Sequence, residues 1–119
     1  MTNIPYLIAK EDWDKIIELK AAEPLMKALD NLDEDDSTYT DAIYALGQIK
    51  DTIAVDFLIK ALGSEEEGVR MSAAQALGDI GDVRVIETLI DAISDEDDEV
   101  RESIAMALGE FGGEAVEPL

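Results

Sequence analysis

The stretch VRMSAAQALGDIGD, residues 69–82, decides the fold of this chain. It is typical of a helix, yet it carries glycine at positions 78 and 81, and glycine inside a helix costs about 1 kcal/mol relative to alanine. Near copies lie on both sides, TYTDAIYALGQIKD at 38–51 and VRESIAMALGEFGG at 100–113. An internal repeat would explain why the glycines are kept.

The repeat has a period of 31 residues. The ALG triplets begin at Ala45, Ala76 and Ala107, and the Val69-Arg70 pair recurs 31 residues later. Within each unit the apolar residues follow helical spacing. One predicted stripe is Ile86, Leu89, Ile90 and Ile93, with Asp82 as N-cap, and a second is Val100, Ile104, Ala107, Leu108 and Phe111. Each unit is thus predicted to be a pair of helices.

A single helix pair cannot bury both of its faces, so the units must stack. The ALG helices are rich in Ala, Ser and Gly, while VDFLIKAL and VIETLIDAI are bulkier. We therefore place the ALG helices on the concave, more crowded side. Gly47, Gly78 and Gly109 are predicted to allow close approach of neighbouring backbones. Gly81 and Gly112 stand where a left-handed C-cap is expected, and the first unit has the less favourable Lys50 there.

The string VRMSAAQALGDIGDVRVIETLIDAI resembles the short HEAT-like repeats named after phycobilisome lyases. AAEPLMKAL at 21–29 and AVEPL at 115–119 match the last element of the family pattern, and the resemblance covers about residues 20–119. It implies an all-α, right-handed α-solenoid of stacked antiparallel helix pairs. It also implies a binding scaffold, because most members of this family bind varied partners.

The expected organisation is one solenoid over residues 1–119. Residues 1–20 form N-terminal capping helices, 21–50, 51–81 and 82–112 are repeats, and 113–119 begin a truncated repeat. Trp13 should cover the open end of the core; the alternative role for it is partner binding. The first unit departs from the pattern, because Thr38 and Tyr39 replace Val-Arg and Asn31-Leu32 looks like an insertion. At the other end Leu119 would lie at an open edge, which suggests either a fragment or a homo-oligomer formed through that end.

Positions of the ALG helices outside the apolar stripe point into the predicted concavity. In the family these are the variable positions that set binding specificity, and here they make an acidic groove with methionine and tyrosine near its middle. The predicted partner-binding residues are Thr40, Asp41, Tyr44, Gln48, Met71, Ser72, Gln75, Asp79, Glu102, Ser103, Met106 and Glu110, and the groove also includes Asp36, Ser37, Glu67, Gly68, Asp98 and Glu99. The alternative is a solvated inner face with two methionines partly in the core.

Arg70 and Arg101 repeat at one unit inside a strongly acidic protein. We interpret them as a structural ladder rather than as anion contacts, each paired with a loop carboxylate such as Asp82.

The net charge of −20 disfavours nucleic acid and anionic lipid and favours basic partners, although solubility or a salty cytoplasm explains it equally well. No apolar run is long enough to cross a bilayer and the N-terminus lacks signal-peptide features, so we expect a cytoplasmic protein. The acidic runs lack the glycine and spacing of a calcium-binding EF-hand loop. We therefore expect no cofactor and no dedicated metal site.

Enzyme chemistry is poorly supported. The chain has no Cys and no His, and it has no glycine-rich phosphate loop. The His-Glu iron site of deoxyhypusine hydroxylase, a HEAT-like relative, cannot be carried over. We predict a non-enzymatic protein–protein interaction scaffold that binds a basic segment. Two alternatives stay open: a phycobilin-lyase-like or cofactor-assembly subunit, and a structural array with no dedicated ligand.

Overall fold

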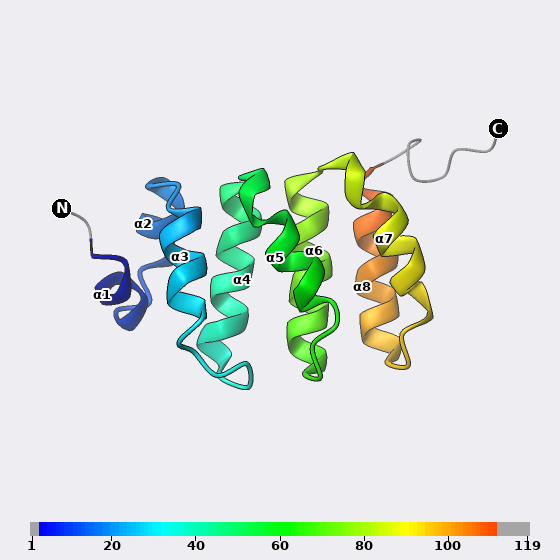
Figure 1. The fold of residues 1–119 in the computed structure, drawn as a ribbon, viewed down its shortest axis with the longest axis horizontal. Coiled ribbons are helices and arrows are strands. Elements are labelled where there is room, and N and C mark those ends of the chain that lie inside the picture. Colours follow the sequence, from blue (N-terminus) through cyan, green and yellow to red (C-terminus); the bar gives the residue numbers. More distant parts are fainter. Residues whose placement is uncertain (1–2, 112–119) are drawn as a thin grey trace.

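The computed structural model describes residues 3–111 and arranges them as helices stacked along one axis, with extents of 51 × 25 × 18 Å (Figure 1). Short 3₁₀ turns precede α5 and α7 and follow α7. No helix among these residues is both long and apolar enough to cross a membrane. The α-helices are α1 (Ile4–Ala9), α2 (Trp13–Glu18), α3 (Ala22–Leu29), α4 (Ser37–Ile49), α5 (Val55–Ala61), α6 (Glu67–Ile80), α7 (Ile86–Asp91) and α8 (Asp98–Gly109).

The helices form two rows, as an α-solenoid requires. We call α4, α6 and α8 the ALG row and α3, α5 and α7 the second row. In the ALG row α4 packs directly on α6 and α6 on α8, whereas contacts between members of the second row are sparse. Helices on the concave side of a curved stack lie closer together than those on the convex side. The tighter packing of the ALG row is therefore what a concave position of these helices requires. The direction and handedness of the curve stay predictions.

The core lies between the two rows. The stripe predicted for α8 is confirmed, because Val100, Ile104, Ala107 and Phe111 are buried and Leu108 is partly buried. At the equivalent positions of α6, Val69, Ala73, Ala76 and Leu77 are buried and Ile80 is partly buried. Alternation of small and branched apolar residues thus fills the space between rows without a large aromatic content.

The stripe predicted for residues 86–93 is only partly right. Leu89 is fully buried and Ile86 partly buried, but Ile90 and Ile93 are 45% and 37% exposed. The residue that joins Leu89 in the core is Val85. The physical reason is that α7 has only six residues between two 3₁₀ turns, which wind at three residues per turn and rotate the flanking side chains off the helical stripe.

Close approach explains two of the three glycines in the ALG triplets. A Cβ atom on Gly47 would lie 2.8 Å from Ala76 Cα, and one on Gly78 would lie 3.0 Å from Ala107 Cα. Both glycines are buried. The expectation is wrong for Gly109, which has no such neighbour within 4 Å among the described residues.

The C-caps behave as the sequence predicts. Gly81 ends α6 in the left-handed region with φ of 73°, and its N–H donates to Leu77 O at 3.1 Å. Lys50 ends α4 with φ of 62°, a conformation that costs a residue with a Cβ atom about 1–2 kcal/mol. Gly112 lies outside the described residues.

Many of the acidic residues act as N-caps. The carboxylate of Asp82 accepts a hydrogen bond from the Arg84 N–H at 3.0 Å, as predicted for the start of its helix. The same Asx geometry begins the helical segments after Asp12, Asp36, Asp51 and Asp97. Part of the negative charge is therefore explained by aspartates that cap the N-termini of helices.

The N-terminal helices cover the first unit. α2 packs against α4 and α1 against α3, so this short pair takes the place of a preceding unit. Ile16 is fully buried, and Trp13 is partly buried against the core with its Nε1 atom inaccessible and without a hydrogen-bond partner. Lys20, which follows α2, is exposed. The boundaries of the individual repeats stay predictions.

Two alanine substitutions test the close contact. Gly47→Ala should lower the free energy of unfolding by about 1–3 kcal/mol, because the new methyl group clashes with Ala76. Gly109→Ala should raise it by up to about 1 kcal/mol, because only the helix propensity changes. Urea unfolding followed by circular dichroism measures both. Equal effects of the two substitutions would contradict the role assigned to Gly47.

Candidate functional site

The positions predicted to face the concavity share one surface of the ALG row. We call this surface the ALG face. None of its members is buried: each is exposed or partly exposed, and they come from α4, α6 and α8 or the capping residues of these helices. Residues at the same level of successive helices are 31 apart, for example Tyr44, Gln75 and Met106. The ALG face therefore consists of lines of equivalent residues, one residue from each helix, that run along the stack.

The middle of the ALG face carries exposed apolar side chains. Tyr44 is 48% exposed and Met106 is 68% exposed. Met71 is partly buried and packs against the core, so it contributes less free surface. Large apolar side chains that stay in solvent on a face otherwise rich in carboxylates provide contact area for a partner.

A hydrogen bond on the ALG face connects two neighbouring units. Gln48 Nε2 donates to Asp79 Oδ2 at 3.0 Å. Partial burial and the charge of Glu110 raise the pKa of Asp79, while Lys50 and the Gln48 hydrogen bond oppose that rise. Gln48 and Asp79 are therefore held together by a hydrogen bond, and the nearby charge of Glu110 makes it less favourable for Asp79 to be ionised.

A carboxylate pair lies at the opposite end of the ALG helices. Glu67 approaches the side chain of Asp97, and sharing of a hydrogen bond with Asp97, followed by its negative charge, raises the pKa of Glu67. Glu67 is exposed, so water screens this pair. Among residues 3–111 no group of three or more carboxylates is arranged to hold a metal ion.

Arg70 and Arg101 pair with carboxylates, but the carboxylate named from sequence was wrong. Arg70 Nε donates to Asp95 Oδ2 at 2.9 Å, and the two side chains are only 12% and 15% exposed. Arg101 donates from Nη1 to Asp95 O at 2.6 Å and pairs with Asp98. Asp82 instead pairs with Arg84, two residues away, because its capping position turns its carboxylate toward its own helix.

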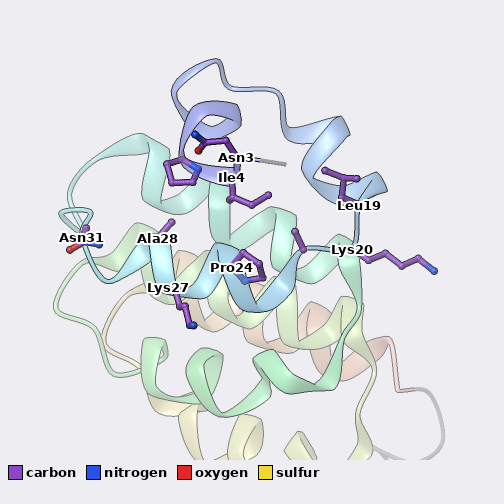
Figure 2. Close-up of a pocket in the computed structure, with 10 residues that line it drawn as sticks. Asn3, Ile4, Leu19, Lys20, Pro24, Lys27, Ala28 and Asn31 are labelled. Carbon is purple, nitrogen blue, oxygen red and sulfur yellow. The ribbon is translucent and has the colours of Figure 1, made fainter. Parts of the chain in front are cut away.

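The cavities of the described structure lie away from the ALG face. One of about 930 Å³ lies between α1, the end of α2 and α3 (Figure 2). Ile4, Leu19, Pro24 and Ala28 wall it, and the Lys20 side chain extends away from it. No residue that the sequence analysis assigned to partner binding lines this cavity.

A second cavity, of about 950 Å³, lies between the α3–α4 and α5–α6 loops. Sequence reasoning missed it, although two signals pointed there: the acidic run at 30–36 and the replacement of Val-Arg by Thr38-Tyr39. Tyr39 lines this cavity.

Comparison with known families agrees with the stacked helix pairs. The family profile described as HEAT repeats matches residues 22–109, and the one described as PBS lyase HEAT-like repeat matches residues 100–119. The chain belongs to the HEAT-repeat family. A search of curated proteins found no match to it.

HEAT repeats are typically non-catalytic helical scaffolds, and they commonly mediate protein interactions. The Glu67 and Asp97 carboxylates of this HEAT-repeat protein have pKa values that shift in opposite directions, but the pair lies at the surface, where water screens the interaction.

Removal of Arg70 tests the ladder. Arg70→Ala should lower the free energy of unfolding by about 2 kcal/mol, because it leaves the Asp95 carboxylate and the Ser64 carbonyl without their donor. Arg84→Ala, which breaks a solvent-exposed pair, serves as the control and should have a smaller effect. Urea unfolding at neutral pH compares them; a larger loss for Arg84→Ala would contradict the assignment.

The raised pKa of Asp79 predicts a pH dependence. In the unfolded chain its pKa is 3.8, and in the folded protein the pKa is higher, so folding favours the protonated form. Its contribution to stability is therefore present below about pH 4 and is lost as the pH rises toward neutrality through the folded pKa. Asp79→Asn should raise the free energy of unfolding at pH 7 and reduce its decrease between pH 4 and 7. Asp41→Asn, an exposed acid on α4, corrects for the general effect of removing a charge. Unfolding curves between pH 4 and 7 provide the measurement, and a destabilised Asp79→Asn protein at pH 7 would refute the prediction.

Proposed function

We propose that this HEAT-repeat protein is a non-enzymatic interaction scaffold that binds a basic segment of a partner protein on the ALG face. The observation that carries the proposal is the exposure of Tyr44 and Met106 at the centre of a face whose remaining charged members are all acidic. Apolar side chains that stay in solvent at 48% and 68% exposure offer anchoring area, and the surrounding carboxylates attract lysine and arginine.

Charge supports the choice of a basic partner. The ALG face includes Asp41, Asp79, Glu102 and Glu110 and no Lys or Arg among its assigned members. Its end next to the loops adds further carboxylates. Long-range attraction of this kind accelerates encounter and weakens as salt rises.

The proposed binding mode crosses the units. A partner segment that runs along the stack meets one helix after another, so it contacts equivalent positions such as Tyr44, Gln75 and Met106 in turn. The Gln48–Asp79 hydrogen bond keeps two neighbouring helices in register, which reduces the ordering cost of binding.

Affinity capture with matched variants tests the proposal. The wild-type protein should retain basic proteins from a native extract at low salt and release them at high salt. Tyr44→Ser with Met106→Ser should weaken retention about tenfold. Ile53→Ser with Val83→Ser is the control, because these apolar residues are 48% and 49% exposed and lie outside the ALG face. Capture that is indifferent to salt, or equal loss in both double variants, would defeat the proposal.

One observation keeps a second candidate function open. The match of residues 100–119 to the PBS lyase HEAT-like repeat is compatible with a phycobilin-lyase-like or cofactor-assembly role. A bilin in a protein pocket changes its absorbance, so mixing the protein with free bilin distinguishes this role. An unchanged spectrum would leave the scaffold proposal in place, or a structural array if capture also fails.

A further inference from the structure

The N-terminal end of the protein differs in charge from the rest of the chain. Residues 1–29 hold four lysines and five Asp or Glu, whereas residues 30–119 hold five Lys or Arg against 24 Asp or Glu. Almost all of the net charge of −20 therefore comes from the sequence after α3. Because salt screens exposed charges that are more than about 10 Å apart, this end can select a partner independently of the acidic ALG face.

The cavity between α1, the end of α2 and α3 lies at this end of the protein (Figure 2). Its volume of about 930 Å³ is in the range of ligand-binding pockets, and most of its surface is apolar. Leu19, which is 38% exposed, and the exposed ring of Pro24 are two of its walls. No Asp or Glu lines it, and its two charged residues are Lys20 and Lys27.

The same lysine position meets different charges in successive units. The motif LMKAL at 25–29 recurs as LIKAL at 58–62, so Lys60 is the counterpart of Lys27. Lys60 lines the second cavity together with six carboxylates, those of Asp30, Asp33, Glu34, Asp35, Glu65 and Glu66. Lys27 lines a cavity with none. The positive charge of the first unit is therefore not balanced by acids on the walls around it.

Lys20 has an uncommon backbone conformation. Its φ is 54°, in the left-handed region that favours glycine, and its N–H donates to Ile17 O at 2.9 Å where the chain turns from α2 into α3. Figure 2 shows its side chain extending outward from the cavity. Neither Lys20 nor Lys27 forms an ion pair among residues 3–111. The flexible stem of a lysine therefore leaves each ammonium able to meet a charge on a segment that lies across the cavity.

We propose that this cavity binds an acidic segment of a partner protein, with an apolar side chain inside the cavity and carboxylates on Lys20 and Lys27. Charge complementarity decides the occupant, because the charged residues on the walls are cations and a basic segment would be repelled. The amide of Asn31, at the opposite end of the cavity from Lys20 in Figure 2, is a further donor for such a segment. The cavity is separate from the ALG face, so this proposal does not depend on the function proposed for that face.

A short synthetic peptide with one leucine flanked by glutamates is the probe, and ¹H–¹⁵N NMR of the full chain follows its binding. The peptide should shift the backbone amides of residues 19–28 saturably. A peptide with glutamines in place of the glutamates should bind about twofold to fivefold more weakly, because it loses the exposed ion pairs. A peptide with serine in place of the leucine should also bind more weakly, since it leaves the apolar cavity unfilled. A leucine flanked by lysines should leave these amides unshifted.

The chain offers a matched control for each lysine. Lys27→Gln should weaken binding about twofold to fivefold, while Lys60→Gln, which removes the equivalent exposed lysine one unit further on, should not. Lys20→Gly should weaken binding to the same extent, while Lys50→Gly, at another exposed lysine with φ of 62°, should not. Glycine favours the left-handed conformation, so both glycine variants should fold, and a loss of binding then reports the missing charge.

Three results would overturn the proposal. Equal affinity for the glutamate and glutamine peptides would mean that apolar contact alone accounts for binding. Equal weakening by Lys27→Gln and Lys60→Gln would mean that general charge attraction does. Shifts at residues 19–28 that appear when the protein alone is concentrated would mean that a second copy of this chain occupies the cavity.

Discussion

The contact between a glycine of one ALG helix and an alanine of the next is the constraint on which the structure depends. Gly47 lies against Ala76, and Gly78 lies against Ala107, at separations that leave no space for a side chain. These contacts fix how closely α4, α6 and α8 approach one another. The helical cost of glycine is thereby offset by packing between neighbouring helices. Because the same contact recurs, equivalent positions align in rows, and the ALG face acquires its order.

The acidic residues divide into groups with different physical roles. Some cap helix N-termini, as Asp36 and Asp82 do. The Asp95 carboxylate is held by Arg70 in a largely buried pair, while the Asp95 backbone carbonyl accepts a hydrogen bond from Arg101. Others, such as Asp41 and Glu102 on the ALG face, form no ion pair among residues 3–111. A net charge alone does not distinguish these groups, whereas the hydrogen bonds of each carboxylate do.

Much of the fold could be predicted from the sequence because the repeat encodes it several times. The period, the α8 stripe and the left-handed cap at Gly81 follow from spacing and residue type. The 3₁₀ turns around α7 did not follow, since they depend on how the short helix meets α8, and so Ile90 and Ile93 were misplaced. The partner of Arg70 was also misassigned, because a side chain that reaches across a loop has no fixed spacing in sequence.

The candidate site was predictable in part. Exposure of the ALG positions follows from helical geometry, so Tyr44 and Met106 could be named in advance. The cavity beside Tyr39 could not, because a cavity depends on the spatial distance between two loops. Only the break in the repeat at Thr38-Tyr39 marked it, and that break was interpreted as irregular packing.

The bonds that join successive units have a consequence for how the molecule assembles. Gln48–Asp79 spans 31 residues, Glu34–Ser64 spans 30 and Arg70–Asp95 spans 25, and no side-chain hydrogen bond among residues 3–111 spans more. Every link is therefore to an immediate neighbour. In such a chain, ordering can start at any helix pair and spread in both directions, with little loop-closure entropy at each step. Loss of order would correspondingly proceed inward from an end, and a weak link in the middle would divide the rod into two separately melting segments.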